Sequence, residues 1–172
     1  MESVADAPEV LMLDSELKVN QFLMRYCRML VGDIADERMA EQPLPGVNHP
    51  AWVLGHLAFS ADGAGGLLGG AKELPAEWTP LFGPGSKPSA SRSDYPSKDE
   101  LLRAVEQGFE RLRQQAAAAT PEQLARPTTN RSTKDALPTV QEGVAFLLTG
   151  HLGVHLGQLS AWRRMTGLPP LL

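Results

Sequence analysis

The pattern of apolar and polar positions predicts a helix at the start of the chain. Asp14 and Ser15 can cap it, because their side-chain oxygens accept hydrogen bonds from the first backbone N–H groups of a helix. Apolar residues then recur in steps of three and four, the period of one helical face. They are Leu17, Phe22, Leu23, Tyr26, Leu30, Val31 and Ile34. The pattern predicts that this helix ends near Met39.

A second helix is predicted from about residue 50 to residue 70. The preceding segment EQPLPGVNHP contains three prolines and a glycine, and Pro50 suits a first helical turn, where no backbone N–H is needed. The first half, AWVLGHLAF, is apolar nearly all round, so periodicity does not orient it. Five glycines lie between Gly63 and Gly70, so the second half either frays or allows another group to approach closely.

Two further helices follow, each after a long connection. Residues 71–96 contain seven helix-breaking prolines and glycines and are predicted to form a crossover loop, which the apolar side chains of Trp78, Leu81 and Phe82 hold against the bundle. Ser97 and Glu100 have the spacing of a capping box, and apolar residues continue at helical spacing to Ala116. The last helix runs from Val140 to about residue 165 and stops at Gly-Leu-Pro-Pro.

These elements predict an all-α fold, a four-helix bundle with long crossover connections in a single domain over residues 1–172. Val, Ile, Thr and Tyr, which favour strands, are sparse. The net charge is −4, and the basic residues form no cluster that could follow a phosphate backbone, so nucleic acid is not expected as a partner. No apolar stretch approaches the roughly 20 residues of a membrane span, and the first residues lack the basic part of a signal peptide. A cytoplasmic protein is expected, with Cys27 as a buried thiol among apolar neighbours.

Histidines are the residues that point to chemistry. His151 and His155 are four residues apart in the last helix, which places their side chains on one face, with Cβ atoms about 5–6 Å apart. That face is continuous with the apolar residues Val144, Leu147, Leu148, Leu159 and Trp162, so both imidazoles are predicted to point into the bundle. Two imidazoles placed this way can bind one metal ion, although a buried histidine can equally bond a backbone carbonyl or a neighbouring side chain.

His56 favours the metal site, because it lies in the apolar half of the second helix, where no solvated face is available. Three histidine ligands leave a coordination position open, as in catalytic metal sites. Zinc and nickel are the leading candidates, since imidazole suits several transition metals. His49 is about 10 Å from His56 along the helix, too far to share an ion, and is interpreted as a surface or capping residue.

The sequence gives weaker evidence that other polar and aromatic residues belong to the metal site. Gln158 could hydrogen-bond a metal-bound water or a ligand, and Asp62 could act as a base or accept the second N–H of a histidine, although each could also be an ordinary polar residue of a helix. Trp52 is interpreted as core or pocket wall. Arg163 and Arg164 could attract an acidic substrate, but their position in a last helical turn favours interaction with the helix dipole.

The segments NHPAWVLGHLAF and HLGVHLGQLSAWRRMTGLPP resemble the DinB/YfiT-like superfamily of metal-binding four-helix bundles. The resemblance implies that His56, His151 and His155 are the metal ligands, that a long crossover joins the helices, and that the protein is a homodimer. Characterised relatives include enzymes that use a low-molecular-weight thiol, and others are described as metal-dependent hydrolases. A metal ion suits both reactions, because it deprotonates a coordinating thiol and lowers the pKa of a bound water.

The sequence therefore predicts a metal-dependent enzyme, a thiol-dependent S-transferase or a hydrolase, that acts on a small molecule at a three-histidine site. It identifies no catalytic acid or base. The alternative is a non-catalytic, metal-stabilised bundle, with a role in stress. A third interpretation is a helical domain whose three core histidines are satisfied by hydrogen bonds without an ion.

Overall fold

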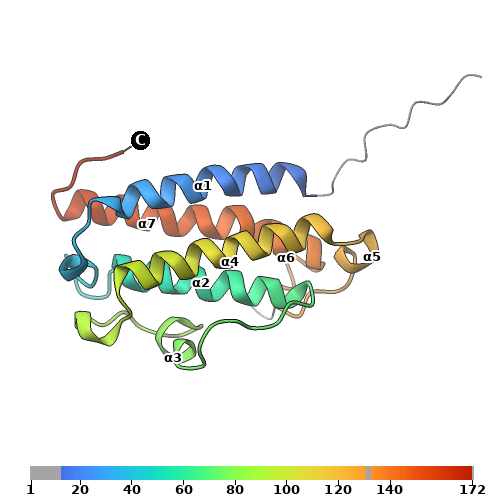
Figure 1. Ribbon diagram of the computed structural model, residues 1–172, viewed down its shortest axis with the longest axis horizontal. Coiled ribbons are helices and arrows are strands. Elements are labelled where there is room, and N and C mark those ends of the chain that lie inside the picture. Colours follow the sequence, from blue (N-terminus) through green and yellow to red (C-terminus); the bar gives the residue numbers. More distant parts are fainter. Residues whose placement is uncertain (1–12, 131–132, 172) are drawn as a thin grey trace, which may run out of the picture.

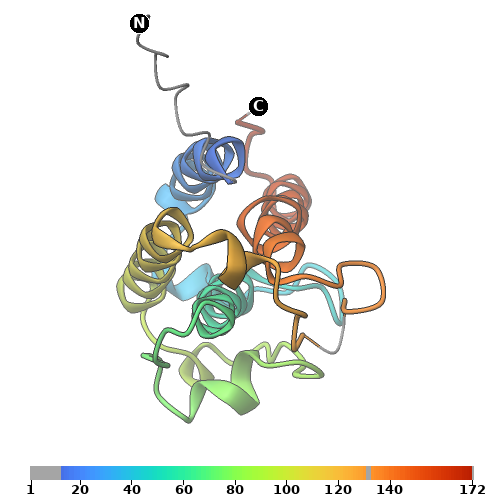
Figure 2. The same cartoon turned by 90° about the vertical axis from the view of Figure 1, so that its right-hand side faces the viewer.

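The computed structural model describes residues 13–130 and 133–171. The regular secondary structure of these residues consists of helices, with no β-strand. Three long helices are α1 (Asp14–Gly32), α2 (Pro50–Leu67) and α4 (Lys98–Ala118). The fourth long segment is continuous but changes its winding, from α6 (Val140–Phe146) through the π-helical η3 (Leu147–His151) to α7 (Leu152–Met165). Figure 1 shows the four segments side by side, and Figure 2 shows them nearly end on. The predicted all-α bundle is confirmed.

Shorter helices lie in the connections, so the chain has more helices than the four predicted. They are η1 (Asp36–Arg38), α3 (Trp78–Phe82), η2 (Arg92–Asp94) and α5 (Pro121–Leu124). The loop after α2 is anchored as expected: Trp78 and Phe82 are buried, and Leu81 is half-buried. Because α3 packs along α2, the loop covers one side of that helix (Figure 2).

The connections arrange the long helices in two parallel pairs. Asn20 bonds the carbonyl of Leu148 near the start of both segments, and Arg163 bonds the carbonyl of Leu30 near their ends, so α1 and α7 run in the same direction. Helices α2 and α4 likewise run in one direction, opposite to the first pair (Figure 1). A long crossover is needed wherever the chain joins two parallel neighbours.

Several helix starts follow the predicted local chemistry. Ser97 and Glu100 form the expected capping box of α4, and Thr139 with Glu142 forms another at the start of α6. Pro50 is the first residue of α2, whose N-cap is His49. These starts could be predicted because each capping bond joins residues only three positions apart.

The first helix differs from its prediction at both ends. Its N-cap is Leu13, without a side-chain capping bond, and the helix ends at Gly32 rather than near Met39. The buried guanidinium of Arg163 donates to the Leu30 carbonyl and to the Asp33 carboxylate, which satisfies the helix end. Arg163 does lie in the last turn of its own helix, α7, but its guanidinium also caps a different helix, α1, which was not predicted. Arg164 is exposed in the last turn of α7.

The helix α2 continues through Gly65 to Leu67, and two of its glycines, Gly55 and Gly65, allow close packing. A Cβ atom at Gly55 would lie 2.1–2.4 Å from the ring of Phe82, and one at Gly65 would lie 2.7 Å from Oε1 of Gln115. Cys27 is buried as predicted, and burial raises the pKa of its thiol to about 12. Within residues 13–130 and 133–171, no helix combines the length and apolar character that a membrane span requires.

Candidate metal centre

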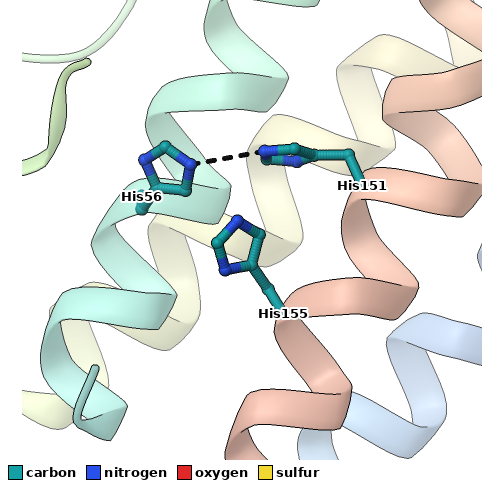
Figure 3. Close-up of side chains that lie close together, drawn as sticks. All are labelled: His56, His151 and His155. Atoms are coloured by element: carbon teal, nitrogen blue, oxygen red, sulfur yellow. Dashed lines mark hydrogen bonds between the residues drawn. The ribbon is translucent and has the colours of Figure 1, made fainter. Parts of the chain in front are cut away.

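Three histidines from two antiparallel segments converge between α2 and α7. His56 comes from the middle of α2, His151 is the last residue of η3, and His155 follows one turn later in α7. One ligand nitrogen from each ring lies within 4.8 Å of the others, and the ring centroids are 4.6–5.2 Å apart. Figure 3 shows the three rings turned toward a common space between the helices.

Hydrogen bonding fixes which nitrogen of His56 faces this space. Its Nδ1 lies 2.8 Å from the carbonyl oxygen of Phe82, at the end of α3. Since a carbonyl only accepts, Nδ1 carries the proton and Nε2 presents a lone pair to the other histidines. The indole of Trp52 stacks on the imidazole ring of His56, with the ring centroids 4.8 Å apart and the ring planes 8° from parallel. Trp52 is thus a wall of the site as well as a core residue.

His155 is oriented by a side chain instead. Its Nδ1 lies 2.9 Å from Oε1 of Gln158, which also accepts a hydrogen bond of 3.1 Å from Nδ2 of Asn48. The proton of His155 is therefore on Nδ1, and Nε2 is free to act as a ligand. Gln158 bonds a histidine directly, which is one of the roles considered from the sequence. Asn48 was missed, because it is 110 residues away from Gln158.

His151 has no comparable support. Its Nε2 lies 3.3 Å from Nε2 of His56, and its Nδ1 is buried with no hydrogen-bond partner among the described residues. Two ligands of a tetrahedral ion, each about 2.0–2.1 Å from the metal, are about 3.3–3.4 Å apart, so the His56–His151 pair has the spacing that one ion requires. The donor set, the shared space and the Nε2 spacing of this one pair fit a transition metal.

The π-helical segment η3 positions the side chain of His151 in this cluster. Single π-helical turns inside α-helices occur frequently at functional sites, and the extra residue that they accommodate rotates the following side chains. Here the turn spans Leu147–His151, and Oγ1 of Thr149 bonds the Ala145 carbonyl one turn back. The sequence pattern predicted one regular helix, because no periodicity rule distinguishes a π turn from an α turn in an apolar stretch.

Burial lowers the pKa of all three imidazoles. The pKa falls below the usual 6.5 for His56, and to about 4 for both His151 and His155, with repulsion between the neighbouring imidazoles as a further cause for the last two. Each ring is therefore neutral near pH 7. Neutrality is the condition under which an imidazole can bind a metal ion.

The remaining candidates lie outside the cluster. Oδ1 of Asp62 accepts a hydrogen bond from the backbone N–H of Glu73 and lies 3.9 Å from the guanidinium of Arg111, and none of its described contacts is with a histidine. His49 is fully buried, so the surface interpretation is wrong and the capping interpretation is confirmed. Its Nδ1 accepts from the Trp52 N–H, and its Nε2 lies 2.8 Å from the Ser89 carbonyl.

Comparison with known proteins agrees with this geometry. A search of curated proteins finds no match to the sequence. The family model of the DinB superfamily matches residues 24–159, a span that includes all three histidines of the cluster. Most of the chain is covered; the first segment on which the resemblance rests lies wholly within the match, and the second lies within it from His151 to Leu159. The chain therefore belongs to the DinB superfamily.

Proposed function

We propose that this protein binds one divalent transition-metal ion through Nε2 of His56, His151 and His155. The observation that carries the proposal is that three neutral imidazoles share one space, with the Nδ1 protons of His56 and His155 committed to acceptors outside it. Zinc and nickel suit such a set of ligands. A metal ion held there would supply Lewis acidity that keeps a small-molecule thiol deprotonated at neutral pH.

The proposed activity is that of a metal-dependent enzyme, a thiol-dependent S-transferase or a hydrolase of a small molecule. Three protein ligands leave a coordination position open, which is the arrangement of catalytic zinc sites. The chain's own residues would orient the ligands and exclude water: the stacked indole of Trp52 and the ring of Phe146, 5.9 Å from that of His151, shield the site. We also propose that the protein acts as a homodimer, in line with other members of the family.

Metal analysis tests the site directly. Elemental analysis of protein purified without a histidine tag or chelator is expected to find about one zinc or nickel ion per chain. His151→Ala and His155→Ala should each lose it, because two imidazoles hold such an ion far more weakly than three. The matched control is His49→Asn, which replaces the fourth histidine with another residue favoured at an N-cap and should keep the metal. Full metal content in both alanine variants would refute the site.

Activity requires a separate experiment, since the non-catalytic alternative predicts the same metal content. Metal-loaded protein is assayed with low-molecular-weight thiols and electrophilic acceptors, and with ester and amide substrates. Turnover above that of free metal, lost in His155→Ala but kept in His49→Asn, would support the enzyme. Stoichiometric metal without turnover on any of these substrates would favour a metal-stabilised bundle.

A further inference from the structure

The Oε1 atom of Gln158 lies between two donors from different parts of the chain. Nδ1 of His155 is 2.9 Å away on the same helix, and Nδ2 of Asn48 is 3.1 Å away across the bundle. Asn48 directly precedes His49, the buried N-cap of α2. Its position is therefore tied to the helix that also carries His56.

The chemistry of this arrangement has a definite direction. Nδ2 of Asn48 only donates and Oε1 of Gln158 only accepts, so Asn48 holds the Gln158 amide with its oxygen toward the histidine. That oxygen in turn requires the His155 proton on Nδ1. The proton position on His155 is thus set from Asn48 through Gln158, and we call these two residues the amide relay.

We propose that the amide relay selects the tautomer of His155 that can bind metal, with Asn48 as a positioning residue that does not contact the ion. The effect on affinity depends on the metal site proposed above, whereas the tautomer is a property of the chain itself. Hydrogen-bond partners of ligating histidines commonly change metal affinity by about 10–100-fold. Nδ1 of His151 has no such partner among residues 13–130 and 133–171, so His155 and His56 are the two proposed ligands whose tautomer is set by a hydrogen bond.

The substitution Asn48→Asp reverses the relay with little change of shape. A carboxylate only accepts at neutral pH, so the Gln158 amide must turn and offer its NH₂ group to the new side chain. The same NH₂ group then faces Nδ1 of His155, which must supply a lone pair, and the proton moves to Nε2. An Nε2 that carries a proton cannot bind the ion. Gln158→Glu, in contrast, still accepts from both neighbours and should keep the tautomer.

The test combines two measurements on metal-free and zinc-titrated protein. At pH 7.5, ¹⁵N–¹H correlation spectra of the histidine rings should show His155 protonated on Nδ1 in the wild type and in Gln158→Glu, and on Nε2 in Asn48→Asp. Competition titration with a zinc chelator should show at least a 10-fold weaker affinity in Asn48→Asp alone. The matched control is Gln42→Glu, the same kind of exchange in the same connection, which removes a bond to the Val47 carbonyl without touching the relay. It should leave both readouts unchanged.

The outcomes separate this inference from the proposed function. An unchanged His155 tautomer and an unchanged zinc affinity in Asn48→Asp would overturn the relay and leave the metal site standing. A wild type that binds no zinc would refute the metal site, while the spectra would still decide the tautomer. If Asn48→Asp does not fold, Asn48→Leu replaces it: loss of the donor frees the amide to turn, and a mixture of His155 tautomers is expected. A single unchanged tautomer with unchanged affinity in that variant would also overturn the relay.

Discussion

The three clustered histidines differ in what holds each ring. A backbone carbonyl at the end of α3 orients His56, a side-chain amide orients His155, and no described residue bonds Nδ1 of His151. A buried polar atom without a partner costs about 1–3 kcal/mol. A metal ion bound at Nε2 of His151 would leave Nδ1 without a partner, so the free-energy cost at Nδ1 would remain. Because no hydrogen bond from a described residue holds Nδ1, the imidazole of His151 is the least constrained of the three.

The depressed imidazole pKa values predict a stability loss in mild acid. The unfolded histidines take up protons below their ordinary pKa of 6.5, whereas His151 and His155 in the fold resist protonation until about pH 4. The unfolded chain therefore binds more protons in this window, and the free energy of unfolding of the metal-free protein should fall from pH 6.5 to about 4. Urea unfolding at a series of pH values measures the slope.

A double variant identifies the residues responsible. His151→Gln with His155→Gln removes both groups and should reduce the slope between pH 6.5 and 4. A part of the slope should remain, because burial also lowers the pKa of His49 and His56. Asp33 and Asp36, whose pKa values are lowered from 3.8 by hydrogen bonds from Arg163 and Arg92, contribute only at lower pH and should behave alike in both proteins. Equal slopes in wild type and double variant would contradict the assignment.

At the residue scale, the sequence identified the three histidines of the cluster and one partner, Gln158, but not the other partners. Helical spacing was enough to pair His151 with His155, and the apolar surroundings were enough to add His56. The Phe82 carbonyl and Asn48 depend instead on how distant segments fold back on α2 and α7. No local rule of spacing encodes such contacts, and the same is true of the buried Arg163 at the end of α1.

At the scale of elements, α3 links the crossover segment to the site. Its last residue, Phe82, packs its ring against Gly55 and accepts a hydrogen bond from His56 with its carbonyl. Trp52 adds a bond of 3.1 Å from Nε1 to the hydroxyl of Ser86, and His49 lies beside the Ser89 carbonyl. One face of α2 therefore holds the segment from Phe82 to Ser89 along its length.

The close contact at Gly55 predicts a coupled loss of stability and metal binding. In Gly55→Ala the new methyl group would overlap the Phe82 ring, so α3 must move away from α2. This movement would lengthen the hydrogen bond between His56 and the Phe82 carbonyl. Overpacking of this kind costs about 1–3 kcal/mol. We expect a lower free energy of unfolding in urea and a weaker zinc affinity by competition titration.

Gly63→Ala provides the matched control in the same helix. Among the residues that the structure describes, no atom beyond the adjacent backbone of α2 lies within 4 Å of a Cβ at Gly63. Alanine there should therefore raise stability by up to about 1 kcal/mol through its helix propensity and leave zinc affinity unchanged. Similar effects of the two substitutions would show that the contact with Phe82 does not position His56.

The elements that could be predicted are those with local signals. Capping boxes, proline at a first turn and three-to-four spacing located α2, α4 and the last helical segment. The early end of α1, the short helix α3 and the π turn η3 depend on tertiary contacts that these signals do not contain. Phe22 also follows the helical period yet is 51% exposed, because periodicity does not distinguish a core face from an uncovered one.

At the scale of the molecule, the three-histidine cluster joins segments that are far apart in the sequence. His56 and His151 are 95 residues apart, on helices that run in opposite directions. A ligand shared by both stabilises the folded state alone, because the unfolded chain holds these histidines far apart. Metal binding should therefore contribute to the stability of the whole bundle and not only to its site.

Thermal unfolding with added metal measures this contribution. Zinc at about 100 times its Kd should stabilise the fold by about 2.7 kcal/mol. For a domain of this size, each kcal/mol raises Tm by about 2–4 °C, so the expected increase is about 5–10 °C. Differential scanning calorimetry of metal-free and zinc-loaded protein would detect it.

The controls decide whether the increase arises at the three histidines. His155→Ala should show no zinc-dependent shift, whereas His49→Asn should show the full one, because His49 bonds Ser89 and the N-terminus of α2 instead of the cluster. Mg²⁺ should have no effect on the wild type, since this cation prefers oxygen ligands. A zinc shift of equal size in His155→Ala would place the ion elsewhere, and the convergence of the three rings would then be a feature of core packing alone.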